Sequence, residues 1–239
     1  MMEYPRLIKE SVDHEVKKLR HMAIVLDGNR RYGKQILGNS SLAAHYGHLM
    51  GTANTIELAS WFINSTDVET LSLFVLAIKN LERDPEEVQE LKRMIGLTLD
   101  TLSETRELKE KGVRIIVAGK REVLEQELQE KIARVERETQ EGNKKRIYLC
   151  IAYDSEDEMK RAAERAKEAG KDLSIKFFDV PEEVDLFIRP AERRMSGFLN
   201  FQAAQAEVIF CDLPFPAMTP TYWKACVLEY YHRKRNLGK

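Results

Sequence analysis

Short runs of apolar residues recur along the chain, and polar or glycine-containing segments separate them. Most of these runs are rich in Ile, Val, Leu and Phe, which is typical of strands that are buried on both faces of a sheet. The strands predicted in this way are residues 22–27, 69–78, 112–119, 145–153, 183–190 and 206–211.

Between these runs, apolar residues recur with a helical period. Residues 42–63 form the first such stretch. A second helix is predicted to begin with Asp84 as the N-cap and Pro85 in the first turn, and Glu87 is placed to complete a capping box. Further helices are predicted at residues 121–140, 156–170 and 222–231. Because strands alternate with helices, the pattern predicts an α/β fold: a single domain, residues 1–239, with a central, mostly parallel six-stranded sheet flanked by helices.

Composition narrows the class of protein. Of 239 residues, 43% are hydrophobic and 32% charged, which is typical of a globular chain, and the formal net charge of -1 argues against a general nucleic-acid binder. The three cysteines are far apart in sequence and are expected to be reduced thiols in a cytoplasmic protein. The N-terminal residues are charged, so we expect no signal peptide. No apolar run approaches the ~20 residues of a membrane span, so membrane contact is expected to be peripheral at most.

Polar clusters follow several predicted strands, which is where ligands bind in open α/β sheets. The clusters are residues 27–31, 77–83 and 189–196, and Glu207 lies in the sixth strand. Arginines provide forked donors for phosphate groups. Asp27 and Glu207 are hard oxygen ligands that suit Mg²⁺, which commonly binds carboxylates together with substrate phosphates. These residue types therefore indicate phosphate chemistry with Mg²⁺ as the cofactor.

Five segments carry a resemblance to a known family. They are HMAIVLDGNRRYGK (21–34), YGHLMG (46–51), NLERDPEEV (80–88), DLFIRPAERRMSGFLNFQAAQAEVIF (185–210) and RKRNLG (233–238). In this order they resemble the cis-prenyltransferases, the undecaprenyl and dehydrodolichyl diphosphate synthases, and the Arg-Arg form of the first box is closest to archaeal or eukaryotic members. The resemblance implies condensation of isopentenyl diphosphate with an allylic diphosphate, farnesyl or geranylgeranyl, to make a polyprenyl diphosphate for a glycosyl carrier lipid.

The resemblance also assigns roles to residues of this chain. Asp27 matches the catalytic, Mg²⁺-associated aspartate, Asn80 the asparagine near the transferred allylic carbon, and Glu207 the second metal carboxylate. The residues matching the allylic diphosphate site are Gly28, Asn29, Arg31, His48 and Arg83, and Arg30 is counted with the substrate-binding residues. Those matching the isopentenyl diphosphate pocket are Arg189, Arg194 and Ser196. The apolar faces of residues 42–63 and 85–102 would then form the walls of a tunnel for the growing chain.

The chain departs from the family pattern in several places, of which three bear most on function. Pro-Ala-Glu follows Arg189 where Thr-Gly-Gly-Glu is usual, and residues 77–80 read Ala-Ile-Lys-Asn where Ser-Thr-Glu-Asn is usual. In the C-terminal tail, which in the family reaches into the partner's site, Asn236 stands in the place of an arginine. These departures bear on substrate choice, on product length and on whether the chain acts alone.

The sequence is compatible with several functions to different degrees. We expect an active prenyltransferase that forms a homodimer, and the alternative is a subunit of a heteromeric cis-prenyltransferase with weak or no activity alone. A non-catalytic partner subunit is disfavoured because such subunits typically lose the Asp-Gly-Asn box. A haloacid-dehalogenase-like phosphatase needs a second acid where Asn29 stands. A pure interaction domain has little reason to gather arginines at strand ends.

Overall fold

The strands of the protein form one sheet. The structure is a computed structural model, and it describes residues 18–234, so the tail residues Arg235, Asn236 and Gly238 lie outside the described residues. The strands are β1 (His21–Val25), β2 (Thr70–Ala77), β3 (Val113–Ala118), β4 (Lys145–Tyr153), β5 (Leu186–Pro190) and β6 (Glu207–Cys211). Their order in the sheet is β3-β4-β2-β1-β5-β6, and every neighbouring pair is parallel. The predicted α/β fold with a parallel six-stranded sheet is therefore confirmed.

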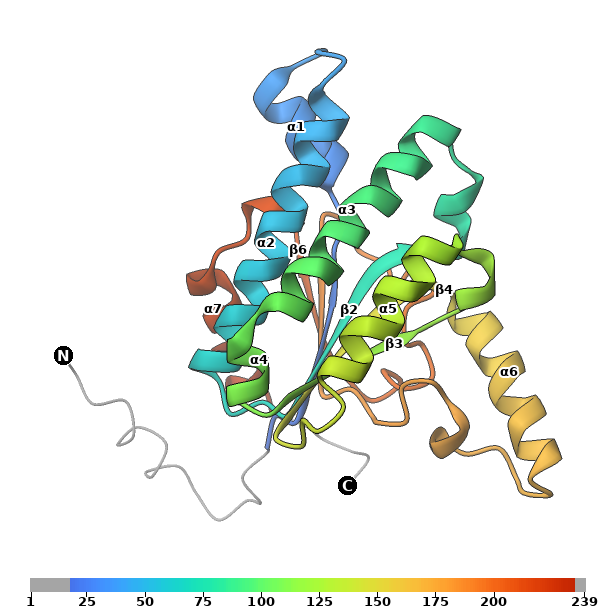
Figure 1. Cartoon of the computed structure of the whole chain (residues 1–239). Helices are drawn as coiled ribbons and strands as arrows, with labels where there is room; N and C mark the ends of the chain where they lie inside the picture. The colour runs from blue at the N-terminus through green and yellow to red at the C-terminus, as the bar shows by residue number, and fades with distance from the viewer. Residues whose placement is uncertain (1–17, 235–239) are drawn as a thin grey trace.

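Helices cover both faces of this sheet. They are α1 (Asn29–Leu37), α2 (Ala43–Ser65), α3 (Pro85–Glu104), α4 (Arg106–Glu110), α5 (Gln126–Glu138), α6 (Ser155–Glu168) and α7 (Pro220–His232). Figure 1 shows α2, α3 and α5 lying across one face, with α7 beside α2. The larger apolar core lies between these helices and the sheet, and a smaller core lies on the other face beneath residues 178–206. None of the helices in the described range 18–234 has the length and hydropathy of a membrane-spanning segment.

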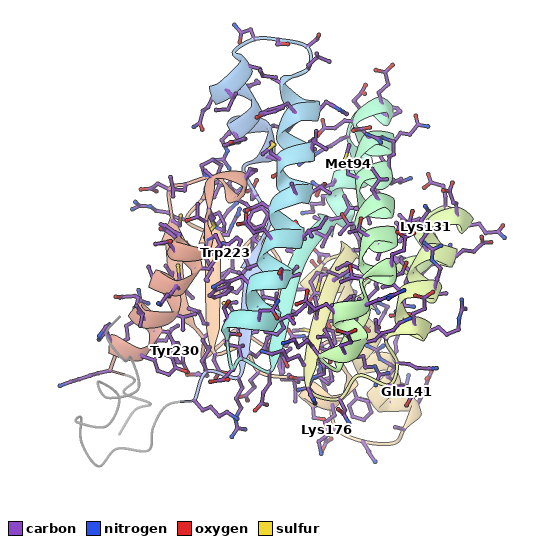
Figure 2. The ribbon with its side chains drawn as sticks, turned by 60° about the vertical axis from the view of Figure 1, so that its left-hand side comes forward. Met94, Lys131, Glu141, Lys176, Trp223 and Tyr230 are labelled. Atoms are coloured by element: carbon purple, nitrogen blue, oxygen red, sulfur yellow. The ribbon has the colours of Figure 1, made fainter. Side chains whose placement is uncertain are left out.

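Side-chain contacts hold helices α2, α3, α5 and α7 together as one layer on this face of the sheet. Trp61 of α2 and Trp223 of α7 have ring centroids 5.6 Å apart, and in Figure 2 Trp223 lies on α7 where it faces α2. On the other side, Lys131 of α5 donates to Asp100 of α3 at 2.6 Å. Helix α3 begins as predicted, because the Asp84 side chain accepts hydrogen bonds from the backbone N–H groups of residues 86 and 87.

The sequence pattern predicts no helix directly after the first strand. Residues 29–37 nevertheless form α1, which packs antiparallel to α2 in Figure 1. Of its residues only Gly33 is buried, and its apolar residues Ile36 and Leu37 are exposed, so α1 is not held by burial of an apolar face. Its position depends on close backbone contact instead: a Cβ added to Gly47 of α2 would lie 2.0 Å from the carbonyl oxygen of Asn29.

The sheet order places two of the predicted clusters side by side. The chain leaves β1 for β2 on one side and returns to pair β5 on the other side of β1, so β1 and β5 flank the switch point of the sheet. Ile24 of β1 is in register with Ile188 of β5. Asp27 and Arg189, which follow these residues, therefore emerge at the same edge of the sheet.

The turn that joins β1 to α1 depends on Gly28. This residue has φ 96°, and a Cβ added to it would lie 2.6 Å from the Pro214 Cβ. Its backbone N–H donates to the Asp27 carboxylate at 2.5 Å, so the tight turn also fixes that side chain.

We predict that Gly28→Ala lowers the free energy of unfolding by more than about 2 kcal/mol, the sum of a left-handed backbone penalty and an overpacking cost. Gly170→Ala is the matched control, because Gly170, just after α6, has φ 62° but nothing lies within 4 Å of its added Cβ. It should cost only about 1 kcal/mol. Urea unfolding measures both variants, and equal losses would show that contact with Pro214 is unimportant.

A buried histidine joins β1 to two other segments. His21 is 1% exposed, its Nδ1 donates to the carbonyl oxygen of Glu183 at 3.0 Å, and its Nε2 lies 2.7 Å from Ser72 Oγ on β2. Since a carbonyl only accepts, Nδ1 carries the proton and Nε2 accepts from the hydroxyl. Burial lowers the pKa of His21 to about 4, in spite of the nearby Glu182 and Asp185 carboxylates.

This shift predicts a loss of stability in mild acid. The unfolded chain takes up the proton near pH 6.5 and the folded chain only near pH 4, so the stability contributed by neutral His21 is lost as the pH falls through that interval. Between pH 7 and pH 5 the protein should lose roughly 2 kcal/mol more than the His21→Gln variant. Urea unfolding at both pH values measures the difference. An equal loss in the two proteins would contradict the assignment.

Candidate active site

The centre of the candidate site is the buried guanidinium of Arg189, at the carboxyl end of β5. Its side chain is 2% exposed. Nε donates to the carbonyl oxygen of Arg194 and Nη1 to that of Pro190, both at 2.9 Å. Nη2 lies 2.9 Å from Asp27 Oδ2, 2.9 Å from Glu192 Oε2 and 3.2 Å from Ser196 Oγ. Arg189 thus joins the end of β1 to the loop that follows β5.

That loop, residues 190–196, contains two non-glycine residues with positive φ, one of them in the segment that departs from the family sequence. Ala191 and Ser196 have φ 66° and φ 59°, in the left-handed region where non-glycine residues cost about 1–2 kcal/mol. The backbone N–H of Ala191 donates to the carbonyl oxygen of Cys211 at 2.7 Å, and its own carbonyl oxygen accepts from Arg31 Nη1 at 2.6 Å. Alanine therefore holds a bend in this chain that glycine would adopt without strain.

Two further arginines complete this cluster and face solvent. Arg31 of α1 is 49% exposed and its Nη2 lies 3.5 Å from both Asp27 Oδ2 and Glu192 Oε1. Arg194 is 72% exposed and its Nη2 lies 2.6 Å from Glu192 Oε2. We call the set Asp27, Arg31, Arg189, Glu192 and Arg194 the arginine cluster. It brings together residues that the sequence assigned to both substrates, because Arg31 was expected with the allylic diphosphate.

Glu192 is the member of this cluster that sequence reasoning missed. It was noted only as part of the shortened Pro-Ala-Glu segment, whereas the structure gives its carboxylate contacts with three guanidinium groups. The available signal was its position, three residues after a strand-end arginine and two before the next one assigned to substrate.

A second group of charged residues lies between α1 and α3. Arg30 is 52% exposed and lies 3.4 Å from Glu87, which also accepts from Arg83 at 2.8 Å. These three residues join the start of α1 to the start of α3. Glu87 was expected to complete a capping box, and its carboxylate is used to hold these two arginines. The Asn80 side chain accepts from the backbone N–H of Ala77 at 3.0 Å and so shapes the turn that precedes α3.

A cavity opens beside both groups, between α2, α3 and the sheet. It contains about 580 Å³ of empty space, including its open mouth. The polar residues Asn29 and His48 line it together with side chains from α3, β2 and β4, mostly apolar: Val75, Leu91, Met94, Ile95, Leu99, Leu149 and Ile151. Figure 2 shows Met94 on α3 at the upper part of this layer. The mostly apolar lining with a few polar groups is typical of a site for an apolar ligand with a polar end.

Two buried polar atoms at this cavity have no partner within the described residues. They are the Oδ1 atom of Asn29 and the Nε2 atom of His48, whose side chain is 7% exposed. Burial lowers the pKa of His48, against the attraction of Glu87, so the imidazole is neutral at pH 7. Unsatisfied buried polar atoms are rare and often mark a ligand site.

The N-terminus of helix α1 contributes a positive electrostatic potential to the site. Asn29, Arg30 and Arg31 form its first turn, which contains no acidic residue. The free backbone N–H groups and the positive end of the helix dipole favour an anion at this point. The Asp-Gly-Asn box thus ends in a helix N-terminus that faces the arginine cluster through Arg31.

Asp27 and Glu207 were expected to be the two carboxylates of one metal site. Within one chain the structure does not bring them together. Glu207 is the first residue of β6 and is in register with Leu186, which is itself in register with Met22 of β1. Asp27 lies five positions further along the strand direction, or about 16 Å at the usual rise. The Glu207 carboxylate lies 3.5 Å from Arg233 Nη1. The sequence pattern placed it in a strand without showing which end of the sheet it would occupy.

The donor set around Asp27 suits a metal ion that arrives with a diphosphate. The Asp27 side chain is 37% exposed, and among residues 18–234 no group of three or more His, Cys, Asp or Glu side chains could hold a metal by itself. Mg²⁺ often binds through one or two carboxylates and completes its shell with phosphate oxygens and water. The residues therefore fit such an ion with Asp27, and not with Glu207, as the carboxylate from this chain.

Comparisons with known proteins agree with this geometry. The family model described as putative undecaprenyl diphosphate synthase matches residues 25–238. An isoprenyl transferase of Campylobacter jejuni is 30% identical over 229 residues, which cover 94% of this chain and 100% of the relative. A geranylgeranyl-diphosphate-specific tritrans,polycis-undecaprenyl-diphosphate synthase of Methanocaldococcus jannaschii is 27% identical, with 99% of this chain and 88% of the relative covered.

Solved structures give the same result. The crystal structure of a probable undecaprenyl diphosphate synthase from Campylobacter jejuni matches with a TM-score of 0.77 and 28% identity, covering 93% of this chain and 100% of the other. Lavandulyl diphosphate synthase from Lavandula x intermedia, solved with dimethylallyl diphosphate, shares the fold with a TM-score of 0.79 at 24% identity, covering 92% and 98%. With a family model that spans most of its length, the chain belongs to the cis-prenyltransferase family.

Proposed function

We propose that the chain lengthens an allylic diphosphate with isopentenyl diphosphate in a Mg²⁺-dependent reaction that yields a polyprenyl diphosphate for a glycosyl carrier lipid. The observation that carries the proposal is that Asp27 of the arginine cluster lies between two residues that line the apolar cavity. Leu26 and Asn29, which flank Asp27 and Gly28, both line that cavity. An allylic substrate can therefore place its diphosphate at the positive end of the site and its hydrocarbon chain between α2 and α3.

The chemistry explains why these residue types are needed. Departure of the allylic diphosphate develops negative charge on phosphate oxygens, and prepositioned arginines and the α1 N-terminus stabilise that charge. A bound Mg²⁺, held by Asp27, would supply Lewis-acid stabilisation of the same oxygens. His48, which is neutral, can donate or accept a hydrogen bond through its unpartnered Nε2. The apolar walls exclude water from the reacting carbon.

Assembly is part of the proposal. Strand β6 is the edge of the sheet, and Phe210 and Leu213 at its end are 43% and 41% exposed. An exposed strand edge with apolar side chains favours pairing with another chain. We propose a dimer through this edge, formed with a second copy or, in the alternative, with a related subunit. The altered tail motif, which suggested the second case, lies outside the described residues.

The function is tested by incubating the purified chain with labelled isopentenyl diphosphate, Mg²⁺ and allylic diphosphates of C10, C15 or C20 length. We expect chain elongation, with the C20 primer among the substrates because archaeal relatives are named as specific for it. Asp27→Ala should lower the rate by ~10²–10³ or more while leaving the fold intact.

The same assay separates the alternatives. Full activity of the chain alone excludes the need for a partner subunit. Activity that appears only on addition of a related chain supports the heteromer. A folded Asp27→Ala protein with normal activity, or no product with any primer and partner, would contradict the proposed reaction.

A second prediction concerns the two groups of arginines. Arg194→Ala should raise the KM for isopentenyl diphosphate more than that for the allylic primer, and Arg83→Ala should do the reverse, because Arg83 lies in the group beside His48. Arg193→Ala is the matched control: Arg193 is 73% exposed, against 72% for Arg194, but it pairs with Asp212 outside the cluster. Steady-state kinetics with each substrate varied in turn measures the effects. Equal effects of Arg193→Ala and Arg194→Ala would contradict the assignment.

A further inference from the structure

The arginine cluster already contains an anion. The Glu192 carboxylate lies 2.6 Å from Arg194 Nη2, 2.9 Å from Arg189 Nη2 and 3.5 Å from Arg31 Nη2. Within residues 18–234, every side-chain hydrogen bond and ion pair of this carboxylate is with one of these arginines. Its two oxygens thus make the contacts that phosphate oxygens would make with the same guanidinium groups.

We propose that Glu192 is an internal counter-anion that occupies the arginine cluster before the substrate arrives and competes with its diphosphate. The proposal rests on the proposed function, because it takes the cluster to be a diphosphate site. Glu192 is therefore a positioning residue: it holds the guanidinium groups in place and sets how tightly they hold a diphosphate.

The other carboxylate of the cluster is held in a different way. Asp27 Oδ1 accepts from the backbone N–H of Gly28 at 2.5 Å, and its Oδ2 accepts from the buried Arg189. Asp27 is thus fixed by the turn that follows β1. Glu192 has a longer side chain, lies on the bend that begins at Ala191, and has no backbone N–H donor among its side-chain contacts in the described residues. Glu192 is the acid that can move away without breaking the turn.

Charge gives the reason for an internal anion. Arg189 is 2% exposed, and a buried guanidinium needs counter-charge and hydrogen-bond acceptors whether or not substrate is bound. Three arginines and two carboxylates leave the cluster with a single net positive charge, so an incoming diphosphate meets a weaker field than the arginines alone would produce. The same carboxylate can return to the arginines when a diphosphate leaves. It therefore favours release of the diphosphate group that the cluster has held.

The test is calorimetric binding of inorganic diphosphate, in buffer containing a chelator so that no metal takes part. Glu192→Gln keeps the size and one acceptor of the side chain but removes its charge. It should bind inorganic diphosphate at least about fivefold more tightly than the wild type, the effect of removing one charge at roughly 4 Å in a water-like medium. Glu192→Ala should change the affinity in the same direction, and circular dichroism checks that both variants are folded.

Asp212→Asn is the matched control. Asp212 pairs with Arg193 of the same loop at 3.2 Å, and its loss changes the net charge by the same amount outside the cluster. Its affinity for inorganic diphosphate should equal that of the wild type. In the enzymatic assay, Glu192→Gln should also lower the KM for isopentenyl diphosphate and make inorganic diphosphate a stronger inhibitor.

The outcomes are distinguishable. If Glu192→Gln binds as the wild type does or more weakly, or if Asp212→Asn tightens binding equally, Glu192 does not compete with the anion, and the proposed reaction is unaffected. If neither the wild type nor Glu192→Gln binds inorganic diphosphate, the cluster is not a diphosphate site, and the proposed function loses its main support as well.

Discussion

The candidate site depends on one electrostatic constraint, which is the burial of the Arg189 charge at the end of β5. A guanidinium that is 2% exposed is tolerated only when its donors and its charge are matched. Asp27 supplies the charge from the neighbouring strand, and the carbonyl groups of residues 190 and 194 supply acceptors from the following loop. The need to balance the buried charge of Arg189 therefore determines how the carboxyl ends of β1 and β5 are arranged.

The arginines of the site differ in burial and therefore in the roles that they can have. Arg189 is engaged on all three of its nitrogen atoms by groups of the protein, so it organises the site, whereas Arg31 and Arg194 are exposed enough to contact a ligand directly. Arg30 and Arg83 form a separate group near His48, joined by Glu87. A single polar rim thus borders an apolar cavity, which is the combination that an amphipathic diphosphate requires.

Much of this could be predicted from sequence, because strand patterns and strand-end residues are local features. The strands and the helix N-cap at Asp84 follow from such features, and so does the proximity of the clusters at residues 27–31 and 189–196. What failed depended on information that local patterns do not contain. Helix α1 is held in place by glycine contacts with α2, which the pattern of apolar residues does not reveal. Glu207 was assigned to the metal site from a motif, but the register of β6 separates it from Asp27 of the same chain, and its metal-binding role stays a prediction. Glu192 acquires its role only when the loop bend turns it toward three arginines.

The central claim is that Asp27 and Arg189 stabilise each other and so hold the site together. A double-mutant cycle with Asp27→Asn and Arg189→Met, measured by urea unfolding, tests this claim most directly. We predict a coupling free energy of about 1–3 kcal/mol, as expected for partners in one buried network. The exposed pair Arg193 and Asp212, at 3.2 Å, serves as the control and should give less than about 1 kcal/mol. Additive effects of the Asp27 and Arg189 substitutions would contradict the account.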